Sequence, residues 1–332
     1  MPHALDLNPL PEDWTHAAGD GLRLELTTRY DSRVFDQFFE AYDKAFVLPD
    51  EKEERSGFEA ALGLNRGETY QRLSRLFAPF REVCLTVHDG KQFVGGANFF
   101  ATISGAADGE PVLTSNLNYI FIEQGMRGKG YLKRIIVAIQ VLIPPLFKAD
   151  RPLATGLMFV EQNDPFRLTL EQYRLDTEVS GLDQFERLSI WGRAGARIVD
   201  HAYVQPPLSK DQEADDTLAL SVIGASGVSI SACVLRDHLE RFFAISVLKG
   251  AEELDEGSAL IQLKGLSTHC AAGQEVRLFD QLPMLAENGA FDDKFEFWTD
   301  ERPPSLVAAL EQFNTGRKLP RVPPDDGSKQ PH

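Results

Sequence analysis

The chain has 332 residues, of which 43% are hydrophobic and 25% are charged, so it can bury a sizeable core and is not disordered throughout. At about 100–200 residues per domain, this length allows two domains or one enlarged domain. The 34 basic and 50 acidic side chains give a formal net charge of −16. A chain this acidic repels phosphate backbones and anionic lipids, so we expect no nucleic-acid partner and a preference for cationic ligands.

Membrane insertion, export and metal binding are not indicated by the sequence. There is no run of about 18 apolar residues, and the first residues lack the basic and apolar regions of an export signal. The seven histidines form no HxH or HExxH pair, so we predict no metal site. Cys84, Cys233 and Cys270 lie far apart, and their odd number fits a reducing compartment better than a disulfide framework. We therefore expect a cytoplasmic protein.

The first ordered elements follow a Pro-rich, polar segment, residues 1–20, which we interpret as a loose N-terminal arm. Residues 22–26 alternate with period two and predict a strand. A helix is predicted after Asp31 and Ser32, either of which can cap it, and a second helical stretch covers 57–77. Aromatic side chains form a stripe on the first helix, which we interpret as core rather than as an aromatic ligand box. The stripe consists of Val34, Phe35, Phe38, Phe39, Tyr42 and Phe46.

A hairpin and a strand–turn–helix unit come next. Residues 81–87 and 93–103 are rich in strand formers and flank an Asp-Gly turn at 88–91, which is a strong hairpin signal. A further strand over 112–123 leads through a glycine-rich turn into a helix over 131–141 that ends before two prolines.

The following region is predicted to contain a strand, a helical insertion, a helix and two strands, over 153–161, 163–186, 187–193, 197–204 and 217–223. The insertion is acidic and could form a substrate lid that attracts a cationic amine, although a helical decoration with a solvated face explains it equally well. Glu171, Asp176, Glu178 and Asp183 give it this acidic character.

The segment 118–132 carries the most information about chemistry. Gly128 and Gly130 allow a tight turn, so that several N–H groups can converge on one anion at the positive end of the next helix dipole. Four cations lie within eight residues here: Arg127, Lys129, Lys133 and Arg134. We therefore predict a phosphate or diphosphate cradle, with a structural turn and a solvated basic face as the alternative. The Rossmann pattern GxGxxG and the Walker pattern are absent.

At these residues the sequence resembles the GCN5-related N-acetyltransferase (GNAT) family. The acyl-CoA signature of that family, Q/R-x-x-G-x-G/A, corresponds to residues 127–132, where Leu132 replaces the expected small residue. Residues 89–95 look like the second hairpin of the family, and 191–195 look like its later helix–turn. Residues 203–208 resemble the end of this region in a bacterial subgroup of unspecified substrate.

The resemblance covers about residues 20–225 and implies a mixed α/β fold with a splayed central sheet. It implies that the pantetheine arm of acetyl-CoA, or of another acyl-CoA, lies in a V-shaped gap between the fourth and fifth strands. The unpaired N–H and C=O groups of such a gap can bond an amide-bearing arm as they would an added strand. The cofactor-binding residues that we predict are Ile122, Arg127, Gly128, Lys129, Gly130, Tyr131 and Leu132.

The customary acid and base of the family have no titrating counterpart here. Asn116 and Asn118 stand where many members have Glu or His; they cannot accept a proton but could hold a water. Trp191 stands at the place of a tyrosine that often protonates the thiolate, and it can donate only a hydrogen bond. Glu123 and Glu161 at strand ends are substitutes for the base, unless they are simply solvated. As the catalytic set we select Glu123, Asn116 and Asn118.

Other side chains are weaker candidates. Tyr119, Tyr173 and Tyr203 could donate a proton, although each also fits a packed aromatic with a satisfied hydroxyl. Cys84 lies in a strand-rich run and fits a buried apolar residue better than a nucleophile.

The domains predicted from these patterns are a GNAT-like domain over 21–225, a C-terminal α+β extension over 226–318 and a disordered tail over 319–332. Within the extension, helices are predicted near 234–243 and 305–313. Strands are predicted over 259–263 and 275–282. The extension could be a second, degenerate acyltransferase-like half, a dimerisation surface, or a cover over the substrate cleft.

The sequence as a whole predicts an acyl-CoA-dependent N-acyltransferase. Acetyl transfer to a primary amine of a small or peptide substrate, by direct attack in a ternary complex, is the reaction that we expect. A non-catalytic acyl-CoA-binding regulatory protein is the alternative from another class. A different acceptor, such as a hydroxyl group or an acyl-carrier partner, is a third.

Overall fold

The computed structural model describes residues 13–18, 20–48, 52–105, 111–147, 156–207, 212–252, 254, 257–287 and 302–316. The predicted disordered tail over 319–332 and most of the predicted N-terminal arm lie outside these described residues.

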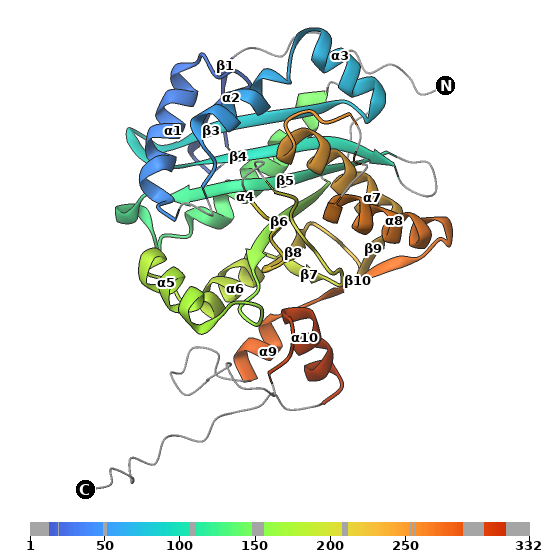
Figure 1. Ribbon diagram of the computed structural model, residues 1–332. Coiled ribbons are helices and arrows are strands. Elements are labelled where there is room, and N and C mark those ends of the chain that lie inside the picture. The colour runs from blue at the N-terminus through green and yellow to red at the C-terminus, as the bar shows by residue number, and fades with distance from the viewer. Residues whose placement is uncertain are drawn as a thin grey trace, which may run out of the picture.

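One ten-stranded mixed sheet forms the centre of the molecule, in the order β1-β2-β3-β4-β5-β6-β8-β7-β10-β9 (Figure 1). Neighbouring strands are antiparallel except β5 and β6, which are parallel. The strands are β1 (Asp13–Ala17), β2 (Leu22–Thr27), β3 (Phe80–Asp89), β4 (Gln92–Gly105), β5 (Pro111–Ile122), β6 (Leu157–Asn163), β7 (Arg197–Val199), β8 (Leu218–Ile223), β9 (Ser229–Ser231) and β10 (Glu275–Phe279). The predicted mixed α/β fold is confirmed.

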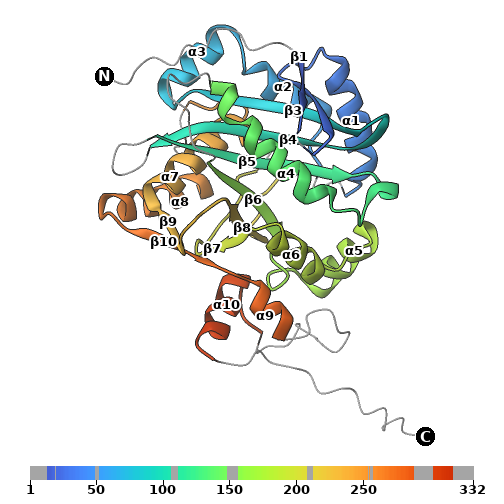
Figure 2. The same ribbon diagram turned by 180° about the vertical axis from the view of Figure 1, so that it is seen from behind.

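Helices cover both faces of the sheet (Figures 1 and 2). One face carries α1 (Arg33–Ala45), α2 (Arg55–Gly63), α3 (Gly67–Leu76), α7 (Ala232–Arg241) and α8 (Gly257–Ala271). The opposite face carries α4 (Tyr131–Leu142) and α6 (Gln184–Arg193). The remaining helices are α5 (Leu170–Ser180), α9 (Leu282–Glu287) and α10 (Leu306–Asn314), together with short turns at Gln124–Met126 and Pro144–Phe147 and a π-helical turn at Phe242–Val247.

The aromatic stripe of α1 lies in the core, as predicted. Phe35, Phe38 and Tyr42 are fully buried against β3, β4 and α2. Ser32 caps the helix by accepting a hydrogen bond from Val34 N. The period of the stripe was therefore a reliable guide to packing.

The helical stretch predicted over 57–77 is two helices, α2 and α3, rather than one. Asn65 lies at the break, and its side chain donates to the carbonyl oxygens of Leu62 and Glu82 while accepting from Glu82 N. This side chain therefore ties the break to β3. Helical periodicity cannot reveal such a bridge, because the partner lies on another element.

Three further predictions need correction. The strand predicted over 259–263 is part of α8, since a short apolar run fits a buried strand and a buried helix equally well. The second of the last two strands is confirmed, but the first, β7, covers only Arg197–Val199 of the predicted 197–204. Residues 13–17, which we expected in the loose arm, pair with β2 as β1.

The cysteine prediction also needs correction. Cys233 at the start of α7 and Cys270 near the end of α8 form a disulfide across a separation of 37 residues. The spacing gave no hint of this pair, because the two helices bring the cysteines together only in the fold. Our argument for a reducing compartment from unpaired cysteines therefore does not hold. Cys84 is free and buried, as predicted.

Residues predicted to form the C-terminal extension continue the same sheet. β10 pairs with β7 on one side and with β9 on the other. α7 packs over β4 and β5, where its side chains share a core with Phe80, Phe100 and Phe159. This part of the chain therefore covers one face of the sheet beside the parallel strand pair. No helix in the described ranges is long and apolar enough to cross a bilayer.

Candidate functional site

The parallel strands β5 and β6 separate after a short contact. Their register pairs end at Asn116 and Phe159, although β5 continues to Ile122 and β6 to Asn163. Beyond that point β5 pairs with β4 alone and β6 with β8 alone. The edges that face each other are therefore unpaired, and the central sheet is splayed, as predicted.

A β-bulge lies at the point of separation. Asn98 of β4 faces Tyr119 and the next residue, Phe99, faces Leu117, so that Asn118 is the additional residue of β5. A bulge bends its strand and redirects a side chain. Here it bends β5 where the two strands part.

The glycine bend between β5 and α4 is open. Gly128 and Gly130 have φ values of 75° and 77°, in the left-handed region that favours glycine, and a Cβ atom at either position would meet nothing within 4 Å. Gly130 is the N-cap of α4, and no side chain caps the helix. Within the described part of the chain, the amides of residues 128–133 donate to no protein acceptor. They form a set of free donors at the positive end of α4.

One aromatic side chain, Tyr131, and one basic side chain, Arg134, hold the glycine bend against neighbouring turns. Tyr131 donates a hydrogen bond of 2.7 Å to Asp89, and the Arg134 guanidinium lies over the Tyr131 ring at 4.9 Å. Arg134 also pairs with Asp20 at 2.6 Å, and this arginine lowers the pKa of Asp20. Both side chains therefore have a positioning role in this structure.

Arg127 and Lys129 are exposed and are held by main-chain oxygens. Arg127 Nε donates to Ile122 O at 3.2 Å, and Lys129 Nζ donates to Gly125 O at 2.9 Å. Neither forms an ion pair with a carboxylate among the described residues. Their charge is therefore available to an anion at the bend. Leu132 is half-buried and packs against the core beneath α4.

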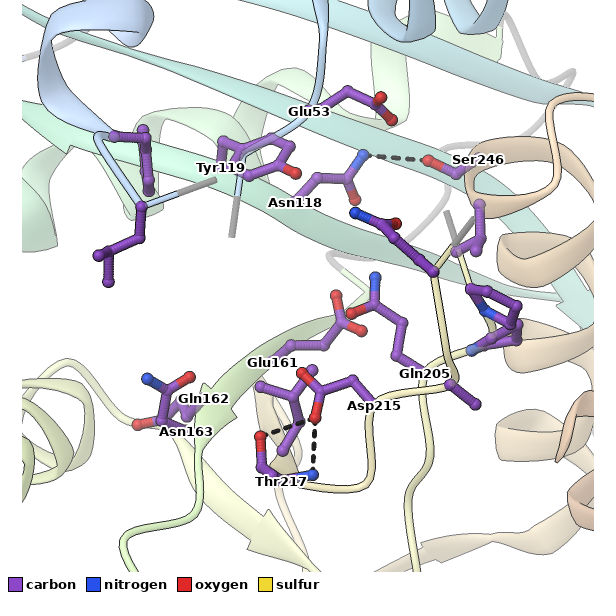
Figure 3. Close-up of a pocket in the computed structure, with 18 of the residues that line it drawn as sticks. Glu53, Asn118, Tyr119, Glu161, Gln162, Asn163, Gln205, Asp215, Thr217 and Ser246 are labelled. Atoms are coloured by element: carbon purple, nitrogen blue, oxygen red, sulfur yellow. Dashed lines mark hydrogen bonds between the residues drawn. The ribbon is translucent and has the colours of Figure 1, made fainter. Parts of the chain in front are cut away.

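A cavity of about 820 Å³ lies beside the gap (Figure 3). Asn118 and Tyr119 of β5 face Glu161 of β6 across it. Other parts of its wall come from residues 46–48 and 53–61, from Glu82 of β3 and Asn98 of β4, and from α5 and α6. The chain around 205–207 and 212–218 and the π-helical turn Phe242–Val247 also contribute. Of the three roles weighed for the C-terminal part of the chain, a cover over the cleft agrees best with this wall.

A line of hydrogen-bonded polar side chains crosses the gap at the cavity. Asn116 Nδ2 donates to Asn118 Oδ1 at 3.0 Å and lies 3.5 Å from Glu161 Oε2. Tyr203, which is buried, donates its hydroxyl hydrogen to the other oxygen of Glu161. Asn118 Nδ2 in turn donates to Ser246 Oγ at 3.1 Å. Both candidate asparagines therefore contact a network that ends on a carboxyl group.

Glu161 is poised to titrate near neutrality. Burial raises its pKa to about 7, against the opposing effect of the hydrogen bonds from Tyr203 and Asn116. A carboxyl with this pKa is partly ionised at neutral pH and can accept a proton from an ammonium group.

The structure does not bring the whole predicted catalytic set together. Asn118 lines the cavity and Asn116 is buried directly behind it. Glu123, by contrast, is exposed at the end of β5 and does not line the cavity. Of the two strand-end carboxylates weighed in the sequence, Glu161 is the one that faces the gap.

The other candidate side chains have structural partners. Tyr173 donates to Asp183, which caps α6, and Asp176 pairs with Arg187 at 2.8 Å. The insertion does reach the cavity, where α5 contributes Leu175 and Asp176 to the wall. Its position agrees with a lid, but Asp176 and Asp183, two of the acidic side chains named for it, already serve the fold.

Sequence reasoning missed Glu82 on β3. Its side chain is fully buried and lines the cavity, and neither carboxyl oxygen has a hydrogen-bond partner in the described structure. Burial raises its pKa to about 7, while nearby Ser246 and Lys249 lower it without Ser246 reaching hydrogen-bonding geometry. The signal in the sequence is an acidic residue next to the apolar run 83–85 of a predicted strand, and most acidic residues are exposed.

Replacing this carboxyl gives a prediction for stability. The folded pKa of about 7 exceeds the ordinary value of 4.5, so the native chain loses stability as the pH rises from about 4.5 through 7. Glu82→Gln removes that loss. We expect its free energy of unfolding to match the native one at pH 4.5 and to exceed it by up to about 3 kcal/mol at pH 8.

Denaturant unfolding at the two pH values measures this difference, with the exposed Glu171→Gln on α5 as the control. A Glu82→Gln variant with equal gains at both pH values would contradict the prediction, because it would show that the pKa of the Glu82 carboxyl is the same in the folded and the unfolded chain.

Metal ligation finds no support in the part of the chain that is described, where no group of three or more His, Cys, Asp or Glu side chains is placed to hold an ion.

The fold and the site define a mixed α/β protein in which a splayed strand pair, an open amide bend and an acidic cavity meet at one gap. No protein-family model matches the sequence, and no curated protein matches it. Among solved structures, a Bacillus subtilis acetyltransferase in complex with CoA is similar, with 13% identity and a TM-score of 0.30, over 61% of this chain and 99% of the other.

Two more solved structures are similar at the same level. A ribosomal-protein alanine N-acetyltransferase from Escherichia coli shares 9% identity over 61% of this chain and 96% of its own, with a TM-score of 0.30. The AtaT mutant toxin, bound to the C-terminus of the antitoxin AtaR, shares 12% identity over 60% of this chain and 92% of its own, with a TM-score of 0.22.

Proposed function

We propose that this chain is an acyl-CoA-dependent N-acyltransferase of the GNAT type, with acetyl-CoA as the donor. One observation carries the proposal: the open amides of residues 128–133 lie one short turn, Gln124–Met126, after a strand whose edge toward β6 is unpaired. A diphosphate on those amides would place a pantetheine arm along residues 117–122 of β5. The amide groups of that arm would supply the missing hydrogen bonds of the strand edge.

The residues at the bend suit an acyl-CoA. Backbone donors and the dipole of α4 favour a diphosphate, and exposed Arg127 and Lys129 add two positive charges in an acidic chain. Tyr131 and Arg134 hold the bend in place through Asp89 and Asp20. The bound thioester supplies the activated acyl group, and the chain orients it toward the cavity.

We assign the base to Glu161. It accepts a proton from the incoming ammonium, so that the neutral nitrogen can form the new C–N bond as the C–S bond breaks. Tyr203 and Asn116 orient the Glu161 carboxyl, and Asn118 can hold a water between it and the amine. Trp191 offers an indole N–H to the departing thiolate from the same cavity wall.

The cavity favours a cationic acceptor. Among the described residues, seven acidic side chains line its wall and only two basic ones, Arg187 and Lys249. Both basic side chains are neutralised by ion pairs, with Asp176 and Glu53. A small amine, or the amino group of a peptide, meets a negative field at the gap.

Release of free thiol from acetyl-CoA across a panel of amines tests the function, with CoA binding measured in parallel by thermal shift. We expect saturable thiol release with at least one primary amine. CoA binding without thiol release from any amine would instead support the non-catalytic acyl-CoA-binding alternative, which the asparagines at positions 116 and 118 allow.

A further inference from the structure

Two carboxyl groups whose pKa burial raises, Glu82 and Glu161, line the same cavity. Glu82 of β3 faces Phe100 of β4, which faces Asn116 of β5 in the sheet register. Two strand spacings therefore separate the backbones of Glu82 and Asn116 by about 10 Å. Asn116 lies 3.5 Å from Glu161, so the cavity has one carboxyl at the gap, Glu161, and another, Glu82, two strands away from Asn116.

Glu82 differs from the other acidic groups near it. Glu53 is paired with Lys249 at 2.6 Å, and Lys249 also donates to the main-chain oxygen of Ser246 at 2.8 Å. The two basic side chains described in the cavity wall, Lys249 and Arg187, are therefore paired with other acids. Glu82 is fully buried and keeps two carboxyl oxygens without a partner. Burying an unpaired carboxylate is costly, so this position favours a cationic ligand that supplies the missing hydrogen bonds.

The same cavity wall carries both polar and aromatic side chains. Asn98, Asn118 and Ser246 contribute polar groups, and Phe58, Tyr119 and Phe242 offer surfaces for methylene groups. A ligand that contacts both carboxyls therefore has a cationic group at each end, with an aliphatic chain between them that can pack on the aromatic rings.

We propose that the acyl acceptor is a small aliphatic diamine or polyamine, whose distal ammonium group binds Glu82 while the nitrogen beside Glu161 is acylated. The acylation half of this statement rests on the proposed function, but binding of the dication does not. Burial raises the pKa of Glu82 to about 7, and an ammonium group beside it draws it into the charged form. A monoamine leaves Glu82 unpaired.

Calorimetric titration without acyl-CoA tests the binding half, with diaminobutane and butylamine as matched probes. We expect diaminobutane to bind the native chain at least about 10-fold more tightly than butylamine, which corresponds to one hydrogen-bonded charge pair. In Glu82→Gln we expect that preference to disappear while butylamine binding stays unchanged. Glu171→Gln, exposed on α5, serves as the control and should keep the preference.

Equal affinity of the native chain for the two amines would overturn the proposal, as would a full diamine preference in Glu82→Gln. The first comparison uses only the native chain, so the test stands even if the variant does not fold. Turnover measurements distinguish failure of the diamine site from failure of the proposed acyltransferase function. Thiol release with equal KM for both amines contradicts the diamine site alone, whereas tight diamine binding without thiol release from any amine contradicts the acyltransferase alone.

Discussion

Replacing Glu161 with glutamine is expected to lower kcat by about 100- to 10,000-fold, the usual contribution of a general base. Glutamine preserves the shape of the side chain and can still bond Tyr203 and Asn116, so the cavity should keep its form. Because Glu161 lies at the gap and not at the glycine bend, the affinity for CoA should not change. Steady-state thiol release and CoA titration measure the two effects separately.

The pH dependence of kcat/KM gives a second test of Glu161 as the base. Glu161 must be ionised to accept a proton, so kcat/KM should rise with pH and level off above its pKa of about 7. In Glu161→Gln this rise should be absent. Glu123→Gln is the matched control, since Glu123 is an exposed carboxyl outside the cavity, and its activity should be near native. If Glu123→Gln lost the activity and Glu161→Gln kept it, the catalytic set selected from sequence would be right and the base assigned from geometry wrong.

Gly130→Asp is expected to weaken CoA binding by about 100-fold or more. At φ 77° a new side chain would extend into the open space over the bend and place a carboxylate beside the bound diphosphate. Like charges about 4 Å apart near a protein surface repel by about 4 kcal/mol, which exceeds what the 100-fold change requires. Pantetheine lacks the diphosphate, so its affinity should change by less than about 3-fold.

A matched glycine isolates the effect of the charge from that of the backbone. Gly273, after α8, has φ 64° and equally open surroundings, and it lies far from the bend in the chain. Gly273→Asp carries the same left-handed strain and the same added charge, so it should leave CoA binding unchanged. Equal weakening of CoA and pantetheine by Gly130→Asp would place the diphosphate elsewhere.

The local features of the site could be predicted from the sequence because they depend on residues close together in the chain. Gly128 and Gly130 sit between a strand and a helix, and both adopt the left-handed conformation that the prediction of a tight turn requires. The aromatic stripe of α1 was also predictable, since its period places Phe35, Phe38 and Tyr42 on one helix face.

Features that depend on distant residues could not be predicted in this way. The Cys233–Cys270 disulfide needs the packing of α7 against α8, and the break at Asn65 needs its contact with β3. Glu123 and Glu161 both stand at strand ends in the sequence. Only the splay shows that Glu161, two residues beyond Phe159, remains on the cavity side.

Glu82 was missed for a related reason. A charged residue in a predicted strand suggests a solvated face, and the structure instead covers this face with α7 and the π-helical turn Phe242–Val247. The cover comes from a part of the chain about 160 residues further on, which local strand patterns cannot anticipate.

Hydrogen–deuterium exchange with and without acetyl-CoA tests the central claim most directly, because it reports where the main chain is protected. We predict slower exchange at two places, the amides of residues 128–133 and those of residues 117–122 on the open edge of β5. Unchanged exchange at both segments with saturating acetyl-CoA, or protection confined to other elements, would contradict the account.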